Sequence, residues 1–233
     1  MILKNILLGA FVAVTATSLF AADAKDEVTK AAKALAEKEN YSWKTTVTVP
    51  EGTQFRPGPT EGKTDKEGTM YVVMTFGDNM TEAVIKGEKV TYTNQDGDWQ
   101  VPDDNAEGPG RFMGARFRNL KAPAAQAQEI AAATKELKKE GEAYIGELTE
   151  AGAKTLMSFR RRAGAEAPEI KNAKGTAKFW VKDCVLSKYE YKVTGSMNFN
   201  GNDVDMDRTT TTEIKDVSTT KVVIPEAAKK KIS

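Results

Sequence analysis

The sequence predicts an α+β fold in which one antiparallel β-sheet is covered on its apolar face by about three helices. The main observation is the segment 174–225, where apolar residues such as Tyr189 and Tyr191 recur at alternate positions. Asp183-Cys184 and Asn200-Gly201 interrupt this pattern where hairpin turns would reverse the chain. Because half of each strand is polar, the sheet needs helices over its other face.

Shorter strand patterns occupy the first half of the chain. In residues 41–50, Tyr41 and Trp43 alternate with polar residues, and the pattern ends at Pro50. Residues 51–68 are rich in Gly and Pro and are expected to form a loop. Further strands separated by glycine-containing turns are expected at residues 69–76, 80–86 and 89–93, and a turn at Asp96-Gly97 then leads toward Trp99.

Three segments carry apolar residues at helical spacing. They are residues 25–39, residues 124–139 after Pro123, and residues 150–162 with Thr149 as a suitable N-cap. A strand at residues 144–148 separates the last two helices. Residues 101–120 form an irregular segment whose length suggests a lid or a binding loop.

The N-terminus has the pattern of a secretory signal peptide. Lys4 precedes an apolar run at residues 6–20, and Ala22-Asp23-Ala24 fits an A-x-A cleavage site. The alternative is a membrane anchor, but the run is shorter than the ~20 apolar residues that span a bilayer. We therefore expect a signal peptide at residues 1–24 and a single exported domain at residues 25–233, located in the periplasm or secreted.

The composition argues against several classes of function. The chain has no histidine, which excludes imidazole-based catalysis and imidazole metal sites. A net charge of +1 gives no field for nucleic-acid binding, and the single Cys184 allows no internal disulfide. Carboxylate pairs remain open as catalysts, but most acidic residues fall on solvent-facing positions. We expect no enzyme activity, no cofactor and no nucleic-acid partner.

One segment imitates a calcium-binding loop. Ser196, Asn198 and Asn200-Gly201, followed by Asp207, follow the spacing of such a loop. The first ligand position is nevertheless a serine, and strand patterns flank the segment where helices should lie. Asn-Gly is also a strong hairpin signal, so a hairpin is favoured and no metal site is predicted.

The last strands carry a resemblance to a known family. The segment FWVKDCVLSKYEYKV, a strand running into Lys215-Asp216-Val217, and the sequence TTKVVIPEAA resemble the C-terminal half of the periplasmic lipoprotein-carrier superfamily, of the LolA type and the LppX and LprG class. The matching positions are Trp180, Asp183, Leu186 and Pro225. The chain departs from this pattern at Cys184, where a turn glycine is expected, and it has no lipobox.

The resemblance implies a half-barrel, which is one curved antiparallel sheet whose concave apolar face is covered by helices and encloses a cavity for acyl chains. Ordinary core packing is the alternative for each cavity residue. The candidate lining residues, all apolar or aromatic, are Trp43, Met70, Met74, Phe76, Tyr92, Phe179, Tyr189, Tyr191, Met197, Phe199 and Met206. Arg111, Arg116 and Arg118 are candidates for contact with a lipid headgroup or a partner, with a solvated loop as the alternative.

These observations favour an exported, non-catalytic carrier or sensor that binds a lipid or a lipidated protein. Methionines suit such a site because their thioethers repack around varied ligands. Contact with the membrane would be transient at most, and an envelope protein partner is a further expectation. The alternative function is a structural or interaction protein of the envelope whose core is filled and which binds no ligand.

Overall fold

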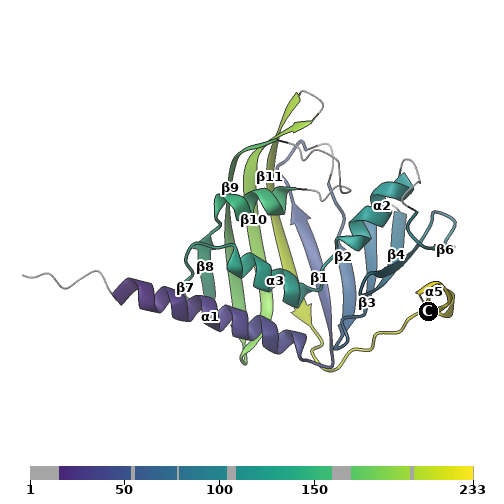
Figure 1. Ribbon diagram of the computed structural model, residues 1–233, viewed down its shortest axis with the longest axis horizontal. Coiled ribbons are helices and arrows are strands. Elements are labelled where there is room, and N and C mark those ends of the chain that lie inside the picture. The colour runs from purple at the N-terminus through teal and green to yellow at the C-terminus, as the bar shows by residue number, and fades with distance from the viewer. Residues whose placement is uncertain are drawn as a thin grey trace, which may run out of the picture.

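The computed structural model describes residues 16–53, 56–77, 79–103, 109–158, 169–199 and 202–232. Within these residues the chain forms one open antiparallel sheet of eleven strands and five helices (Figure 1). The strand order is β6-β5-β4-β3-β2-β1-β11-β10-β9-β8-β7. The first and the last strands of the chain therefore pair at the centre of the sheet.

The element bounds agree with most of the expected ones. The strands are β1 (Asn40–Thr48), β2 (Thr60–Asp65), β3 (Met70–Phe76), β4 (Asn79–Lys86), β5 (Lys89–Thr93), β6 (Trp99–Gln100), β7 (Lys138–Glu140), β8 (Ala143–Glu147), β9 (Ile170–Lys182), β10 (Val185–Phe199) and β11 (Asn202–Lys215). The helices are α1 (Ala16–Ala36), α2 (Pro109–Arg118), α3 (Pro123–Ala132), α4 (Glu150–Met157) and α5 (Glu226–Ile232). The antiparallel α+β fold is confirmed.

Four helices lie on one face of the sheet, which we call the inner face. Figure 1 shows α1, α2 and α3 in front of the strands, and α4 packs against β9 and β10 on the same side. Helix α5 covers the opposite, outer face near one edge, where Ala228 and Ile232 pack on Val84. The main core is the apolar layer between the inner face and its helices.

The expectation of about three helices was too low. Helix α2 lies within residues 101–120, which were expected to be irregular, and α5 lies in the C-terminal tail. The inward stripe of α2 is short: Met113 and Phe117 pack inward one turn apart, among glycines and arginines that conceal the pattern. A glycine-rich segment can therefore form a helix when tertiary contacts bury one side of it.

Strand β2 was missed because its inward residues are small and polar. Thr60, Gly62 and Thr64 face the core, so the alternation lacks the large apolar side chains that usually mark a strand. Conversely, the strand pattern was expected to continue to residue 225, but residues 216–225 form turns and irregular chain outside the sheet. The end of that segment instead leads into α5 on the outer face.

Helix α3 ends at Ala132 instead of continuing to Lys139. Lys25 of α1 donates hydrogen bonds from Nζ to the carbonyl oxygens of Ala132 and Thr134, at 3.1 and 2.9 Å. These bonds satisfy carbonyl groups that the helix end leaves open. The chain then pairs Thr134 with Leu148 and continues as β7.

Two local predictions are confirmed. Asp183 and Cys184 adopt φ angles of 51° and 60°, as a two-residue hairpin of the primed type requires, and Cys184 is exposed in this turn. Thr149 caps α4 by accepting a 3.0 Å hydrogen bond from the backbone of Gly152. Among the helices that the structure describes, none has the length and hydropathy of a membrane span. Helix α1 begins at Ala16, inside the expected signal peptide.

Candidate functional site

The predicted lining residues gather on the inner face. They come from β1, β3, β5, β9, β10 and β11, and of the ten whose side chains the structure describes, all except Met197 belong to or pack against the main core. Eight of them are buried: Trp43, Met70, Met74, Tyr92, Phe179, Tyr189, Tyr191 and Met197. Phe76 and Met206 are half-buried, and the side chain of Phe199 lies outside the described residues. The sequence pattern therefore identified one shared surface, and these side chains are packed together there.

The helices divide into two groups over this face. Helix α2 packs on β4 and β5 at one side, whereas α1 and α4 pack on β9 and β10 at the other. Within the described residues, the main helix contacts fall on these flanking strands, and any on the central strands β1, β2 and β11 are weaker. The centre of the inner face is thus covered mainly by side chains.

The floor of this central region is made of small polar residues. Thr45 and Thr212, on β1 and β11, share a 2.8 Å hydrogen bond between their hydroxyl groups. Trp43 donates from Nε1 to the hydroxyl of Thr64 at 3.0 Å, and its ring lies over Gly62. A Cβ at Gly62 would lie 2.3 Å from the indole ring, so the glycine makes room for Trp43.

Helix α3 is tied to the sheet by tyrosine hydroxyl groups. Tyr189 on β10 donates a 2.6 Å hydrogen bond to Gln126, and Tyr41 on β1 bonds to the backbone of Ala124. Burial raises the pKa of both tyrosines, which keeps their hydroxyl groups neutral. These bonds hold α3 above the inner face.

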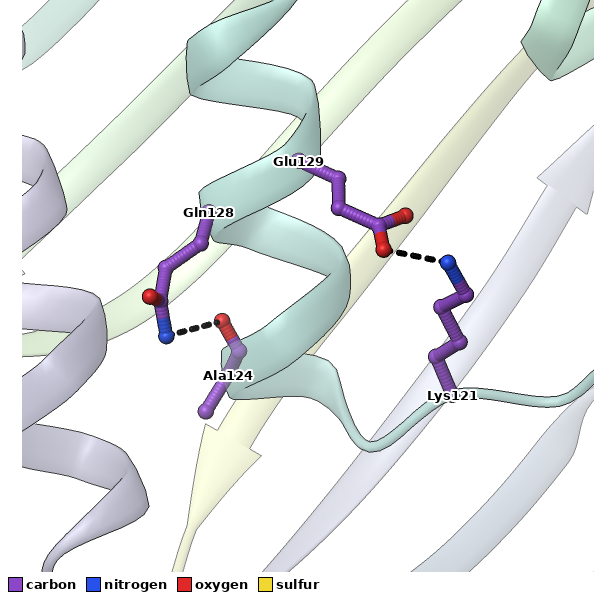
Figure 2. Close-up of polar contacts among 4 residues, drawn as sticks. All are labelled: Lys121, Ala124, Gln128 and Glu129. Atoms are coloured by element: carbon purple, nitrogen blue, oxygen red, sulfur yellow. Dashed lines mark hydrogen bonds and ion pairs between the residues drawn. The ribbon is translucent and has the colours of Figure 1, made fainter.

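A second set of contacts involves α3 and the segment that precedes it. Figure 2 shows the ion pair between Lys121, in the segment before the helix, and Glu129 in the second turn of the helix. It also shows the side-chain amide of Gln128 donating to the carbonyl oxygen of Ala124 at 3.3 Å. The ion pair is solvent-exposed on the Glu129 side, so its contribution to stability is small.

The predicted arginines have different surroundings. Arg116 of α2 places its guanidinium 4.8 Å from the ring centroid of Phe76 at the end of β3. Arg118 is exposed and donates to the carbonyl oxygen of Pro102 at 2.8 Å. The side chain of Arg111 lies outside the described residues. Of the three, Arg116 is the one that the structure places against the inner face.

Sequence reasoning missed Arg208. This residue follows Met206 by two positions on β11, and its guanidinium donates to the carbonyl oxygen of Leu156 near the end of α4. The period of two that placed Met206 on the inner face also places Arg208 there. A charged residue is rarely buried, so the pattern of apolar residues by itself does not indicate Arg208 as an inner-face residue.

Two of the depressions on the described surface lie mainly on the outer side of the sheet. One is lined by residues of the β4–β5 turn and by Ile232 of α5. The other spans β1, β2 and β3 and is lined mainly by outer-face residues such as Lys44, Glu61 and Tyr71. The predicted lining residues are instead packed against one another, with Trp43 and Tyr189 no more than 4% exposed.

A scan against protein-family models gives no match, and no curated protein matches the sequence. Among solved structures, the chain is similar to the lipoprotein LppX of Mycobacterium tuberculosis, with 10% identity and a TM-score of 0.49, over 87% of this chain and 99% of that one. It is also similar to LprF of Mycobacterium bovis, with 11% identity and a TM-score of 0.47, over 89% of this chain and 98% of that one.

LppX belongs to the class that the sequence resembles, and the likeness extends over most of this chain.

Proposed function

We propose that the protein is an exported, non-catalytic carrier or sensor that binds a hydrophobic molecule between its helices and the inner face of the sheet. The ligand is a lipid or the lipid moiety of a lipidated protein. The observation that carries this proposal is the division of the helices into two groups over a continuous apolar layer. A ligand can enter along the central strands without disrupting the sheet, because the helices pack mainly on the strands to either side of them.

The side chains at this boundary suit a variable occupant. Phe76, Met113, Leu120 and Met206 are only partly buried and pack on the main core from α2, from the segment after it and from the strands. Two of the four are methionines, whose unbranched side chains repack at low cost. We infer that a ligand displaces these side chains and separates α2 from the group formed by α1, α3 and α4.

Helix α2 is the element best suited to move. It is ten residues long, and its fully buried anchor is Phe117, whose ring lies 5.7 Å from that of Tyr92. By contrast, α3 is held by hydrogen bonds from Tyr41 and Tyr189. An element with few buried contacts opens locally at a lower free-energy cost than the rest of the fold.

A second function is favoured by one specific observation, the close packing of the predicted lining. Met74, Phe179 and Tyr189 are at most 1% exposed, as in an ordinary core. If this packing persists in solution, the protein is an interaction protein of the envelope with a filled core. Exposed apolar residues such as Phe112 on α2, which is 51% exposed, would then contact the partner.

Native mass spectrometry distinguishes the two functions. The protein is purified from the cells that produce it and examined for bound lipid, then delipidated and mixed with dioleoylphosphatidylglycerol. The carrier function predicts a bound lipid or uptake of the added one. A protein that carries no lipid and takes up none would contradict it and favour the interaction protein.

Matched variants locate the site. Met206→Lys introduces a charge on the inner face and is expected to reduce lipid uptake at least about tenfold, since a lysine there must be desolvated by the apolar ligand. Val223→Lys is the control because Val223 is 69% exposed and lies outside the sheet. Equal uptake by both variants would exclude the inner face as the binding surface.

A further inference from the structure

We propose that Arg116 and Arg208 together bind the anionic group, a phosphate or a carboxylate, of an amphiphile whose apolar part lies on the inner face. This inference rests on the proposed function and assigns the chemical class of the ligand. It also gives a role to Arg208, which the strand pattern places on the inner face.

The strand register brings the two residues to the same end of the inner face. One row across the sheet runs from Met74 through Thr60 and Thr45 to Thr212. Phe76 lies two residues beyond Met74, and Arg208 lies four residues before Thr212. Because β3 and β11 run in opposite directions, both steps lead toward the same end of the sheet.

The two guanidinium groups approach this end from opposite sides. Arg116 reaches it from α2 and lies over the Phe76 ring, whereas Arg208 reaches it from β11 and contacts the end of α4. Between them lies the end of β1, where Val47 is half-buried. Three strand spacings, about 14 Å in all, separate β3 from β11, and two long side chains with an anion between them can bridge this span.

The electrostatics of Arg116 favour a negatively charged ligand. Among the residues that the structure describes, no carboxylate forms an ion pair with its guanidinium. Burial, and then the positive charge of Arg208, lower the pKa of Arg116. Two cations that share a partly desolvated site repel each other, and an anion placed between them removes this cost.

The surroundings indicate that the anion belongs to an amphiphile. The planar fork of arginine matches phosphate and carboxylate groups and forms two parallel hydrogen bonds with them. Phe76, Met113 and Met206 belong to the apolar layer next to this end of the inner face. A ligand with a charged head and an apolar body would satisfy both parts of the site at once.

The test compares ligands that differ only in the headgroup. Tryptophan fluorescence and native mass spectrometry follow the binding of dioctanoylphosphatidic acid, dioctanoylglycerol and inorganic phosphate to the full chain. We expect the wild-type protein to prefer phosphatidic acid over diacylglycerol by at least about tenfold. Arg116→Gln and Arg208→Gln are each expected to reduce this preference about tenfold, and binding of diacylglycerol should not change.

Two further variants control for folding and for surface charge. Arg118→Gln removes an exposed arginine from the same helix and should leave the preference unchanged. Arg116→Lys keeps the charge and should retain part of the preference. Without ligand, Arg116→Gln should melt no lower than the wild-type protein because it relieves the repulsion with Arg208, and a large loss of stability would assign Arg116 a structural role and overturn the proposal.

The outcomes separate this inference from the proposed function. If neither lipid binds, the proposed function fails and the anion site fails with it. If both lipids bind equally in the wild-type protein and in the arginine variants, the anion site is overturned while the hydrophobic site stands. If inorganic phosphate alone binds as tightly as phosphatidic acid, the site holds a free anion and its role as a headgroup site is overturned.

Discussion

The hydroxyl group of Tyr189 on β10 donates a 2.6 Å hydrogen bond to the side-chain oxygen of Gln126 on α3, 63 residues earlier in the chain. This bond joins the helix layer to the central part of the sheet. Tyr189 is fully packed within the core, so its hydroxyl group needs a partner there. Gln126 provides that partner and thereby fixes the position of α3.

Replacing Tyr189 with phenylalanine should therefore destabilise the protein by about 1–2 kcal/mol, since the amide of Gln126 loses its partner near the core. Urea denaturation measures this free energy of unfolding, and hydrogen exchange should show faster exchange in α3. Gln128→Ala on the same helix is the control, because it removes only a 3.3 Å bond to the helix backbone. Equal losses for both variants would show that the bond between Tyr189 and Gln126 does not hold the helix.

Gly62 is expected to tolerate no side chain while Trp43 is present. A Cβ at this position would lie 2.3 Å from the indole ring, so Gly62→Ala should cost about 1–3 kcal/mol through overpacking. Tryptophan fluorescence should shift as the ring of Trp43 is displaced. The double variant with Trp43→Phe should lose less than the sum of the two single variants, and additive losses would contradict the contact.

Tyr71 should make stability depend on pH in the alkaline range. Burial, then the hydrogen bond of 2.7 Å to Glu82 and the negative charge of that carboxylate, raise the pKa of Tyr71 from 10.0 to about 12. A raised pKa in the folded state means that the contribution to stability is complete below pH 10 and is lost as the pH rises toward 12.

Chemical denaturation across this pH range measures the effect. Tyr71→Phe should lose less stability than the wild-type protein between pH 10 and 12 because it has no hydroxyl group to ionise. Glu82→Gln removes the nearby charge and should give an intermediate slope. A Tyr71→Phe variant with the same slope as the wild-type protein would show that this pair does not govern the alkaline transition.

The mature N-terminus should be Lys25 if the predicted signal peptide is removed after Ala24. The contacts of Lys25 with the end of α3 and the buried residues Val28, Ala32 and Leu35 would remain. A protein that begins at Lys25 should therefore have the same melting temperature, within about 2 °C, as one that begins at Ala16. N-terminal sequencing of the exported protein identifies the cleavage site, and a much less stable shortened protein would contradict this domain boundary.

Local patterns explain most of the elements that were predicted correctly. The alternation of Phe179, Tyr189 and Tyr191 with charged residues predicts strands with one buried face, and all three are buried. The turn at Asp183-Cys184 and the cap at Thr149 depend on residues close in the chain, so sequence alone indicates them. Such signals are short in range and do not need the rest of the fold.

The predictions that were wrong concern features that depend on residues far apart in the chain. Strand β2 is a strand because β1 and β3 pair with both of its edges, although Thr60, Gly62 and Thr64 give no apolar alternation. The need for a glycine at position 62 follows only from the tertiary structure, in which the ring of Trp43 lies over it. Helix α3 ends at Ala132, whose carbonyl oxygen accepts a hydrogen bond from Lys25, more than a hundred residues earlier in the chain.

By itself the sequence determined the antiparallel sheet, its apolar face and the absence of imidazole chemistry, because strand alternation and composition can be seen one segment at a time. Only the tertiary structure decided that β1 and β11 meet at the centre, that α2 and α3 cover separate parts of the inner face, and that Arg208 lies at the same end of it as Arg116. These relationships join residues far apart in the chain, and they are fixed by strand register and by packing between layers, which no local pattern encodes.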